Sequence, residues 1–201
     1  GGSISCNQCS FTSEDNVFVG NSNKVTEIEE TLDDEFYGGG AIFLLQPINT
    51  TIISRSQFLG NIASVQGGAL HIEDVRADAF KKVPREVIIS DSVFSSNQIV
   101  AHPGICRIPE KCVLRGGALS FVGISAVIYN TSLTVNQITN TVSAEAQLKG
   151  GALYMVGTFL GTHTLLIENS AFRGNSAFVG EIGSSSKSGS GGAIFASNVD
   201  Q

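Results

Sequence analysis

The sequence predicts an all-β protein folded as a parallel β-helix, a solenoid in which each coil of chain stacks on the previous coil. Three observations lead to this prediction: a recurring Gly-Gly-Ala motif, a second motif that follows it, and short apolar strands with no helices between them. A β-sandwich with recurrent turns is the alternative fold. The fixed order of two different motifs favours the β-helix, because sandwich turns do not need to recur in such an order.

The first motif is a pair of glycines followed by alanine and an aliphatic residue. It reads GGAI at Gly39 and Gly191, and GGAL in three further copies that begin with the pairs Gly67 and Gly68, Gly116 and Gly117, and Gly150 and Gly151. We expect tight corners here, because glycine adopts positive φ and permits close backbone approach. The next residues are predicted to stack in the core as an alanine column and a leucine column: Ala69, Ala118 and Ala152, then Leu70, Leu119 and Leu153.

The second motif is an aliphatic residue, a polar pair ending in Ser or Thr, and then Phe-x-x-Asn, with Leu133 replacing Phe in one copy. We predict an apolar column of Phe58, Phe94 and Phe172. We also predict an asparagine ladder, because asparagine tolerates left-handed corners and its amide can bond the coils on both sides. The ladder residues are Asn61, Asn97, Asn136 and Asn175. A looser first copy spans Ile4 to Asn16, with Phe11 as its aromatic residue.

The copies have no constant period, since successive glycine pairs are 28, 49, 34 and 41 residues apart. Fixed coils joined by loops of different length would explain this spacing. We therefore predict about five to six coils in a single segment over residues 1–201, read as a fragment of a longer protein. Residues 76–83 are the best helix candidate. Loop insertions, the expected contact surfaces, are predicted at Asn23–Tyr37, Val75–Arg85, Ile99–Arg115 and Gly183–Ser190.

Composition excludes several function classes. The formal net charge is -6, and residues 1–40 hold eight acidic residues and one basic residue. No basic cluster suits nucleic acid. No run of about 20 apolar residues could span a membrane, so no membrane insertion by this segment is expected. No cofactor is expected either.

The paired motifs resemble the polymorphic outer membrane protein (Pmp) repeats of chlamydiae, from about Gly38 to Ala196. Similar repeats occur in other bacteria and in some protists and algae. The resemblance implies a right-handed β-helix displayed at a cell surface, with an adhesive role. It therefore implies an extracellular or cell-surface location.

Cysteines and glycosylation sequons also point to secretion. We expect Cys106 and Cys112 to form a disulfide that closes a long insertion. Cys6 and Cys9 are a second candidate pair, although Cys9 occupies the Ser position of the looser copy and could be a small core residue. A shared zinc site is disfavoured, because the two pairs are several coils apart. The sequons begin at Asn49 and Asn130, of which Asn49 is the better acceptor because Asn130 lies within the repeat.

The candidate chemistry is sparse. His71, His102 and His163 are expected to face solvent. The acidic run Glu27–Glu35 lacks the ligand spacing of a calcium loop and is expected to be solvated. The Ser/Gly-rich stretch 183–192 is expected to be a flexible loop, since it lacks the strand and helix of a phosphate-binding loop.

Two functions remain open. The first is a non-enzymatic adhesive or structural segment whose partners are other proteins or glycans at a cell surface and neighbouring coils of the same parent chain. The alternative is a carbohydrate-active β-helix, a lyase or hydrolase, that uses Glu73 or Asp74. Such enzymes cluster carboxylates on adjacent rungs. Here the matching positions hold Ser, Val or Gly, and Asp91 and Glu168 are out of register.

Overall fold

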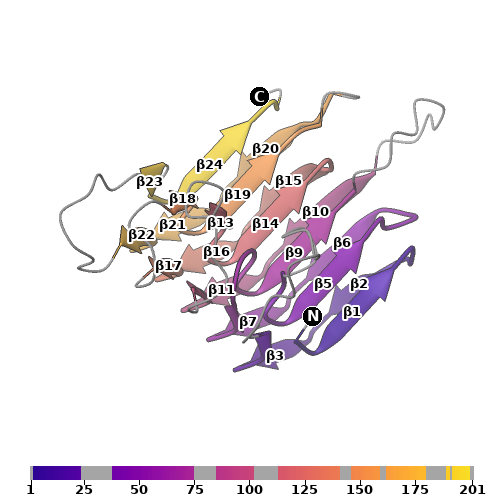
Figure 1. The fold of residues 1–201 in the computed structure, drawn as a ribbon. Helices are drawn as coiled ribbons and strands as arrows, with labels where there is room; N and C mark the ends of the chain where they lie inside the picture. Colours follow the sequence, from indigo (N-terminus) through magenta and orange to yellow (C-terminus); the bar gives the residue numbers. More distant parts are fainter. Residues whose placement is uncertain are drawn as a thin grey trace.

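The fold is a parallel β-solenoid, which confirms the predicted fold class. The computed structural model describes residues 2–23, 38–74, 85–101, 113–140, 146–158, 162–179, 189–190 and 192–199. All regular structure in these residues is β-strand, and all strand pairings are parallel (Figure 1). No helix in the described part of the chain is long and apolar enough to span a membrane. The helix candidate at 76–83 lies outside the described residues.

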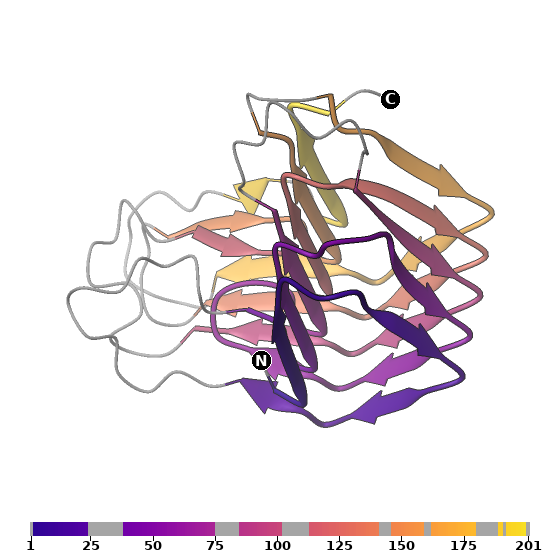
Figure 2. The same ribbon diagram turned by 90° about the vertical axis from the view of Figure 1, so that its right-hand side faces the viewer.

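Three sheets surround the main core, and successive coils stack from the indigo N-terminal coil to the yellow C-terminal coil (Figure 2). Sheet A follows the glycine corners and contains β1 (Ile4–Asn7), β5 (Ile42–Leu45), β9 (Leu70–Glu73), β14 (Leu119–Val122), β19 (Leu153–Val156) and β24 (Ile194–Ser197). Sheet B contains β2 (Thr12–Glu14), β6 (Thr51–Ser54), β10 (Glu86–Ser90), β15 (Ser125–Tyr129) and β20 (Leu165–Glu168). Sheet C contains β3 (Val17–Val19), β7 (Gln57–Leu59), β11 (Val93–Ser95), β16 (Ser132–Thr134) and β21 (Ala171–Arg173).

Two further sheets build a second, smaller core that the sequence did not predict. Sheet D contains β4 (Ser22–Asn23), β8 (Ile62–Ala63), β12 (Gln98–Val100), β17 (Gln137–Asn140) and β22 (Ser176–Val179). Sheet E contains β13 (Val113–Arg115), β18 (Gln147–Lys149) and β23 (Gly189–Ser190). Side chains of both sheets, including Ile99, Ile138, Leu114 and Leu148, bury one another there. The sheets contain up to six strands, in line with the predicted five to six coils.

The two glycines of each corner serve different purposes. The first glycine has a left-handed backbone, with φ of 57° at Gly67 and 66° at Gly116. The second glycine lies against the next coil wherever another coil follows, so a Cβ atom on Gly68 would overlap the carbonyl oxygen of Gly117. Both positions therefore exclude side chains, one through conformation and one through contact.

The four predicted asparagines form a continuous ladder that joins neighbouring coils. The Nδ2 atom of Asn97 donates to Oδ1 of Asn136 at 3.0 Å and to the carbonyl oxygen of Phe58 at 2.9 Å. Its Oδ1 atom accepts from the backbone N and Nδ2 of Asn61, at 3.0 and 2.9 Å. The same bonds extend to Asn175 at the other end. Each buried amide thus satisfies backbone groups of the adjacent coils.

The backbone conformation expected at this ladder is wrong. The ladder asparagines do not have positive φ; the residue before each of the four does, and these residues are Gly60, Ser96, Val135 and Gly174. The corner therefore turns one residue earlier, and the asparagine side chain points inward to bond the neighbouring coils. Val135 adopts this conformation with a φ of 54° despite its branched side chain.

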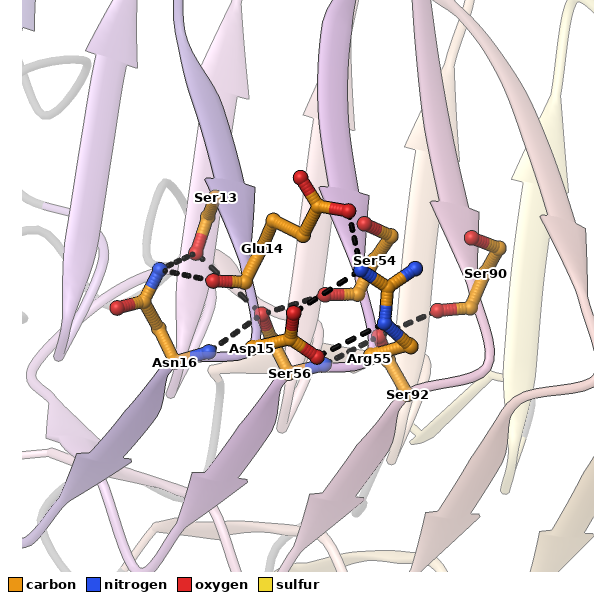
Figure 3. A network of polar contacts seen from close by, with 9 residues as sticks. All are labelled: Ser13, Glu14, Asp15, Asn16, Ser54, Arg55, Ser56, Ser90 and Ser92. Atoms are coloured by element: carbon orange, nitrogen blue, oxygen red, sulfur yellow. Dashed lines mark hydrogen bonds and ion pairs between the residues drawn. The ribbon is translucent and has the colours of Figure 1, made fainter.

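A second ladder, made of hydroxyl groups, follows the corner between sheets B and C. The backbone N of Ser56 donates to Oγ of Ser92 at 3.1 Å, and that Oγ donates to the carbonyl oxygen of Ser90 at 2.6 Å (Figure 3). Thr131 and Ser170 repeat the arrangement in later coils. This ladder explains why the motif requires Ser or Thr two residues before its aromatic position.

The aromatic column begins one coil earlier than predicted. Phe18, Phe58 and Phe94 stack with ring centroids 4.7 and 4.6 Å apart. Leu133 and Phe172 continue the column in register. The first copy of the motif is thus Phe18 to Asn21, and the predicted assignment of Phe11 and Asn16 is wrong, because Asn21 bonds Asn61.

The uneven repeat spacing comes from the connections between sheets. Sequence separations along the asparagine ladder are 40, 36, 39 and 39 residues, much more regular than the spacing of the glycine pairs. Residues 24–37, 102–112, 141–145 and 180–188, which lie outside the described residues, each follow a strand of sheet D. Residues 75–84 follow β9 instead. The predicted insertions cover these connections, but three of them are too wide: Asn23–Tyr37 includes the end of β4, Ile99–Arg115 includes β13 and part of β12, and Gly183–Ser190 includes β23. The connections leave the ladders in register.

Candidate functional site

Buried titratable groups gather on the outer face of sheet A and at the corner that follows it. Leu70 and Ile72 of β9 point into the main core, so His71 and Glu73 face outward. Both are nevertheless buried, at 0% and 4% exposure, and His71 Nε2 lies 3.2 Å from Glu73 Oε2. The expectation that His71 faces solvent is wrong, because the outer face of sheet A is covered at this rung. We call His71, Glu73, Asp74 and Arg85 the sheet A polar cluster.

Asp74 and Arg85 form the second pair of this cluster. Arg85 Nη1 donates to Asp74 Oδ2, and the side chains are only 13% and 8% exposed. The ion pair joins the end of β9 to the start of β10. Because a buried carboxylate needs compensation, Arg85 stabilises the charged form of Asp74 in place of water.

His163 is a further titratable residue near this corner. It is half-buried, and its Nε2 atom lies 3.2 Å from Oγ1 of Thr158. Burial lowers the pKa of His163, while the negative charge of Asp74 acts in the opposite direction. The expectation that this histidine faces solvent therefore holds only in part. His102 lies outside the described residues.

The carboxylates of this cluster do not stack along the axis. In register with Glu73 are Leu45 in the preceding coil and Val122 in the following coil. Asp91 is at the left-handed corner between sheets B and C, and Glu168 pairs in register with Tyr129. The acidic residues of successive coils thus occupy different columns, as the sequence indicated.

The exposed corner between sheets B and C holds a charged network around Arg55 (Figure 3). Arg55 Nε donates to Asp15 Oδ1 at 2.8 Å, and its Nη2 atom also contacts Glu14. The hydrogen bond from Arg55 lowers the pKa of Asp15. These side chains are at least half exposed, so their ion pairs contribute little to stability. Both Glu14 and Asp15 of the first coil are paired with Arg55.

The predicted modification sites have clear positions. Asn49 is exposed and donates to Ser10 Oγ at 2.7 Å. Asn130 is exposed at a left-handed corner with a φ of 47° and donates to Asp91 Oδ1 at 3.2 Å. Both sequon asparagines therefore lie on the surface. The structural contact expected for Asn130 is its bond to the preceding coil.

A disulfide joins Cys6 and Cys9 across the first corner. The looser copy predicts that Cys9 occupies the Ser position of the repeat, and this prediction is wrong. Asn16 occupies that position and donates its backbone N to Ser56 Oγ. Cys106, Cys112 and the acidic run Glu27–Glu35 lie outside the described residues. Within the described ranges, no three His, Cys, Asp or Glu side chains are placed to hold a metal ion.

Comparison with known proteins gives no relative for this chain. No family model, no curated protein and no solved structure matches it.

Proposed function

We propose that this chain is a non-enzymatic segment of an extracellular or cell-surface protein, a rigid rod that presents loops for adhesion or structural assembly. The observation that carries the proposal is the continuity of the ladders. Asparagine and hydroxyl side chains bond each described coil to the next through buried and partly buried hydrogen bonds. Such a stack resists bending and tolerates insertions between its strands. It suits presentation of variable segments from a constant frame.

Three further features support an extracellular location. The disulfide between Cys6 and Cys9 suits an oxidising compartment. The exposed sequons at Asn49 and Asn130 suit a eukaryotic secretory route. The similarity of the paired motifs to Pmp repeats supports the adhesive part of the proposal, with other proteins or glycans as partners.

The location can be tested on the parent protein in its native source. We expect surface biotinylation of intact cells, or recovery from the medium, to capture the protein. Glycopeptide mapping is expected to find an N-glycan at Asn49 if the source is eukaryotic. An unglycosylated parent that continues into an outer-membrane barrel would also support the proposal as a bacterial passenger. Recovery only from the cell interior would overturn it.

A carbohydrate-active enzyme is the second candidate, and the sheet A polar cluster is the observation that favours it. The His71–Glu73 pair has a histidine and a carboxylate within proton-transfer distance. Glycan turnover by the purified chain is expected to fall at least about a hundredfold in Glu73→Gln if this pair is catalytic. Reducing-end and unsaturated-product assays would measure it. Turnover that persists in Glu73→Gln and in Asp74→Asn would exclude both carboxylates.

A further inference from the structure

Two basic side chains lie one coil apart at the same position of the repeat, immediately before a glycine pair. Arg115 and Lys149 are in register at the ends of β13 and β18. The Arg115 guanidinium lies 5.6 Å from the ring centroid of Tyr154, and Lys149 Nζ lies 5.1 Å from that of Phe195. Both rings belong to the outer face of sheet A, and they stack on each other at 5.4 Å. The two cations therefore flank a short aromatic stack, and we call these four side chains the cationic row.

The positive charges of the row have no matching carboxylates in the described part of the chain. Arg115 donates through Nη1 to Gln66 Oε1 at 3.2 Å, its Nε atom is buried without a hydrogen-bond partner, and neither cation forms an ion pair there. Burial lowers the pKa of Lys149, and the neighbouring charge of Arg115 lowers it further. Two like charges held together and partly desolvated favour an anion that bridges them.

The surroundings distinguish between classes of anion. Stacking on Phe195 and contact with Arg115 leave the Tyr154 ring without a free face for a nucleobase, whereas nucleic-acid sites offer such faces. Coils repeat about every 4.8 Å, while alternate side chains of an extended peptide repeat about every 6.6 Å, so an acidic peptide fits the row poorly. Each pyranose unit extends a polysaccharide by about the axial spacing between adjacent coils.

We propose that the cationic row binds an acidic polysaccharide that runs along the solenoid axis, with a carboxylate or sulfate bridging Arg115 and Lys149. The inference rests on the proposed adhesive function and names its ligand class. Uronates and sulfated sugars share the required chemistry. The eight acidic residues of positions 1–40 precede the first predicted insertion or lie within it, whereas the row belongs to later coils.

The test is a calorimetric titration of the purified 201-residue chain with three probes of similar length. A heparin-derived octasaccharide supplies sulfate, an octagalacturonate supplies carboxylate, and maltooctaose is neutral. We expect at least one acidic probe to bind, with affinity that falls as salt is raised, and maltooctaose not to bind. The acidic probe that binds identifies the source of the anion.

Charge-neutralising variants locate the binding. Arg115→Gln and Lys149→Gln are each expected to weaken binding about tenfold or more, with unchanged melting temperatures. Arg173→Gln is the matched control. Arg173 is exposed on sheet C, and its substitution by Gln removes the same charge. Its binding should equal that of the unmodified chain.

Several results would overturn the inference: no binding by either acidic probe, equal binding of maltooctaose, or equal losses in Arg173→Gln and Lys149→Gln. Tighter binding of a single-stranded oligonucleotide of equal charge would also overturn it, in favour of nucleic acid. These binding results would not affect the surface location, which is tested separately on the parent protein. A chain that reaches the surface but binds no acidic sugar would leave the proposed function standing.

Discussion

Phe94→Asp is expected to destabilise the solenoid by more than about 4 kcal/mol, enough to unfold the central coils. Phe94 has no exposed surface and stacks on Phe58 with nearly parallel rings. Its neighbour on the other side, Leu133, is also fully buried. A carboxylate there would lose the stacking contacts and would lie between two apolar rungs without a cation. Urea denaturation followed by far-UV circular dichroism would measure the change in the free energy of unfolding.

Two control substitutions separate the effect of burial from the effect of strand chemistry. Val93→Asp places the same residue one position earlier, where the side chain is 36% exposed on the outer face of sheet C. It should cost less than about 1 kcal/mol. Phe94→Leu should cost about 1–2 kcal/mol, because leucine already occupies this position in the next coil. Equal stability of Phe94→Asp and Val93→Asp would contradict the stacked column.

The inward-facing columns could be predicted from the sequence because solenoid stacking repeats their chemistry. Ala69, Ala118 and Ala152 are fully buried and hydrogen-bonded from coil to coil, and Leu70, Leu119 and Leu153 are in register. Each coil places the same residue against the next, so a motif repeats wherever the environment repeats. The aromatic column and the asparagine ladder follow the same logic.

Outward-facing positions could not be predicted, because no repeated neighbour determines them. His71 is in register with Phe43 on one side and Ser120 on the other, so no motif indicates its burial. Arg115 and Lys149 precede their glycine pairs at a position that also holds Gln66 in an earlier coil. A search for like charges at equal distance from the repeated glycines would have found the cationic row.

The predicted motif of the first coil is wrong because two aromatic residues lie close to the expected position of the repeat. Phe11 packs at the edge of the main core, while Phe18 enters the stacked column. Asn16, and not Cys9, occupies the Ser position, so the motif begins later in the chain. Asn21 decides the register, because its backbone N and Nδ2 both reach Asn61 Oδ1, at 3.0 and 2.8 Å. Spacing within one imperfect copy cannot reveal that contact.

Gly68→Ala tests the close approach of coils most directly, and we expect it to destabilise the protein by more than about 3 kcal/mol. The new Cβ atom would overlap the carbonyl oxygen of Gly117 and would lie 2.6 Å from the backbone N of Gln98. Neither neighbour can move freely. Gly117 N donates to Gly150 O at 3.1 Å, and Gln98 N donates to Asn61 O at 2.8 Å. Relief of the overlap therefore requires breaking hydrogen bonds between coils.

Gly192→Ala is the matched control, because Gly192 occupies the same place in the repeat but its Cβ atom would meet nothing within 4 Å. We expect its free energy of unfolding to stay within about 0.5 kcal/mol of the unmodified chain or to rise slightly, since alanine restricts the unfolded state. The difference between the two variants isolates the effect of the coil that covers Gly68. If Gly68→Ala unfolded at the same urea concentration as Gly192→Ala, the second glycine of the motif would need an explanation other than coil spacing. Hydrogen exchange at Leu70 and Ile99, which flank the overlap, would then show whether the coils had separated locally.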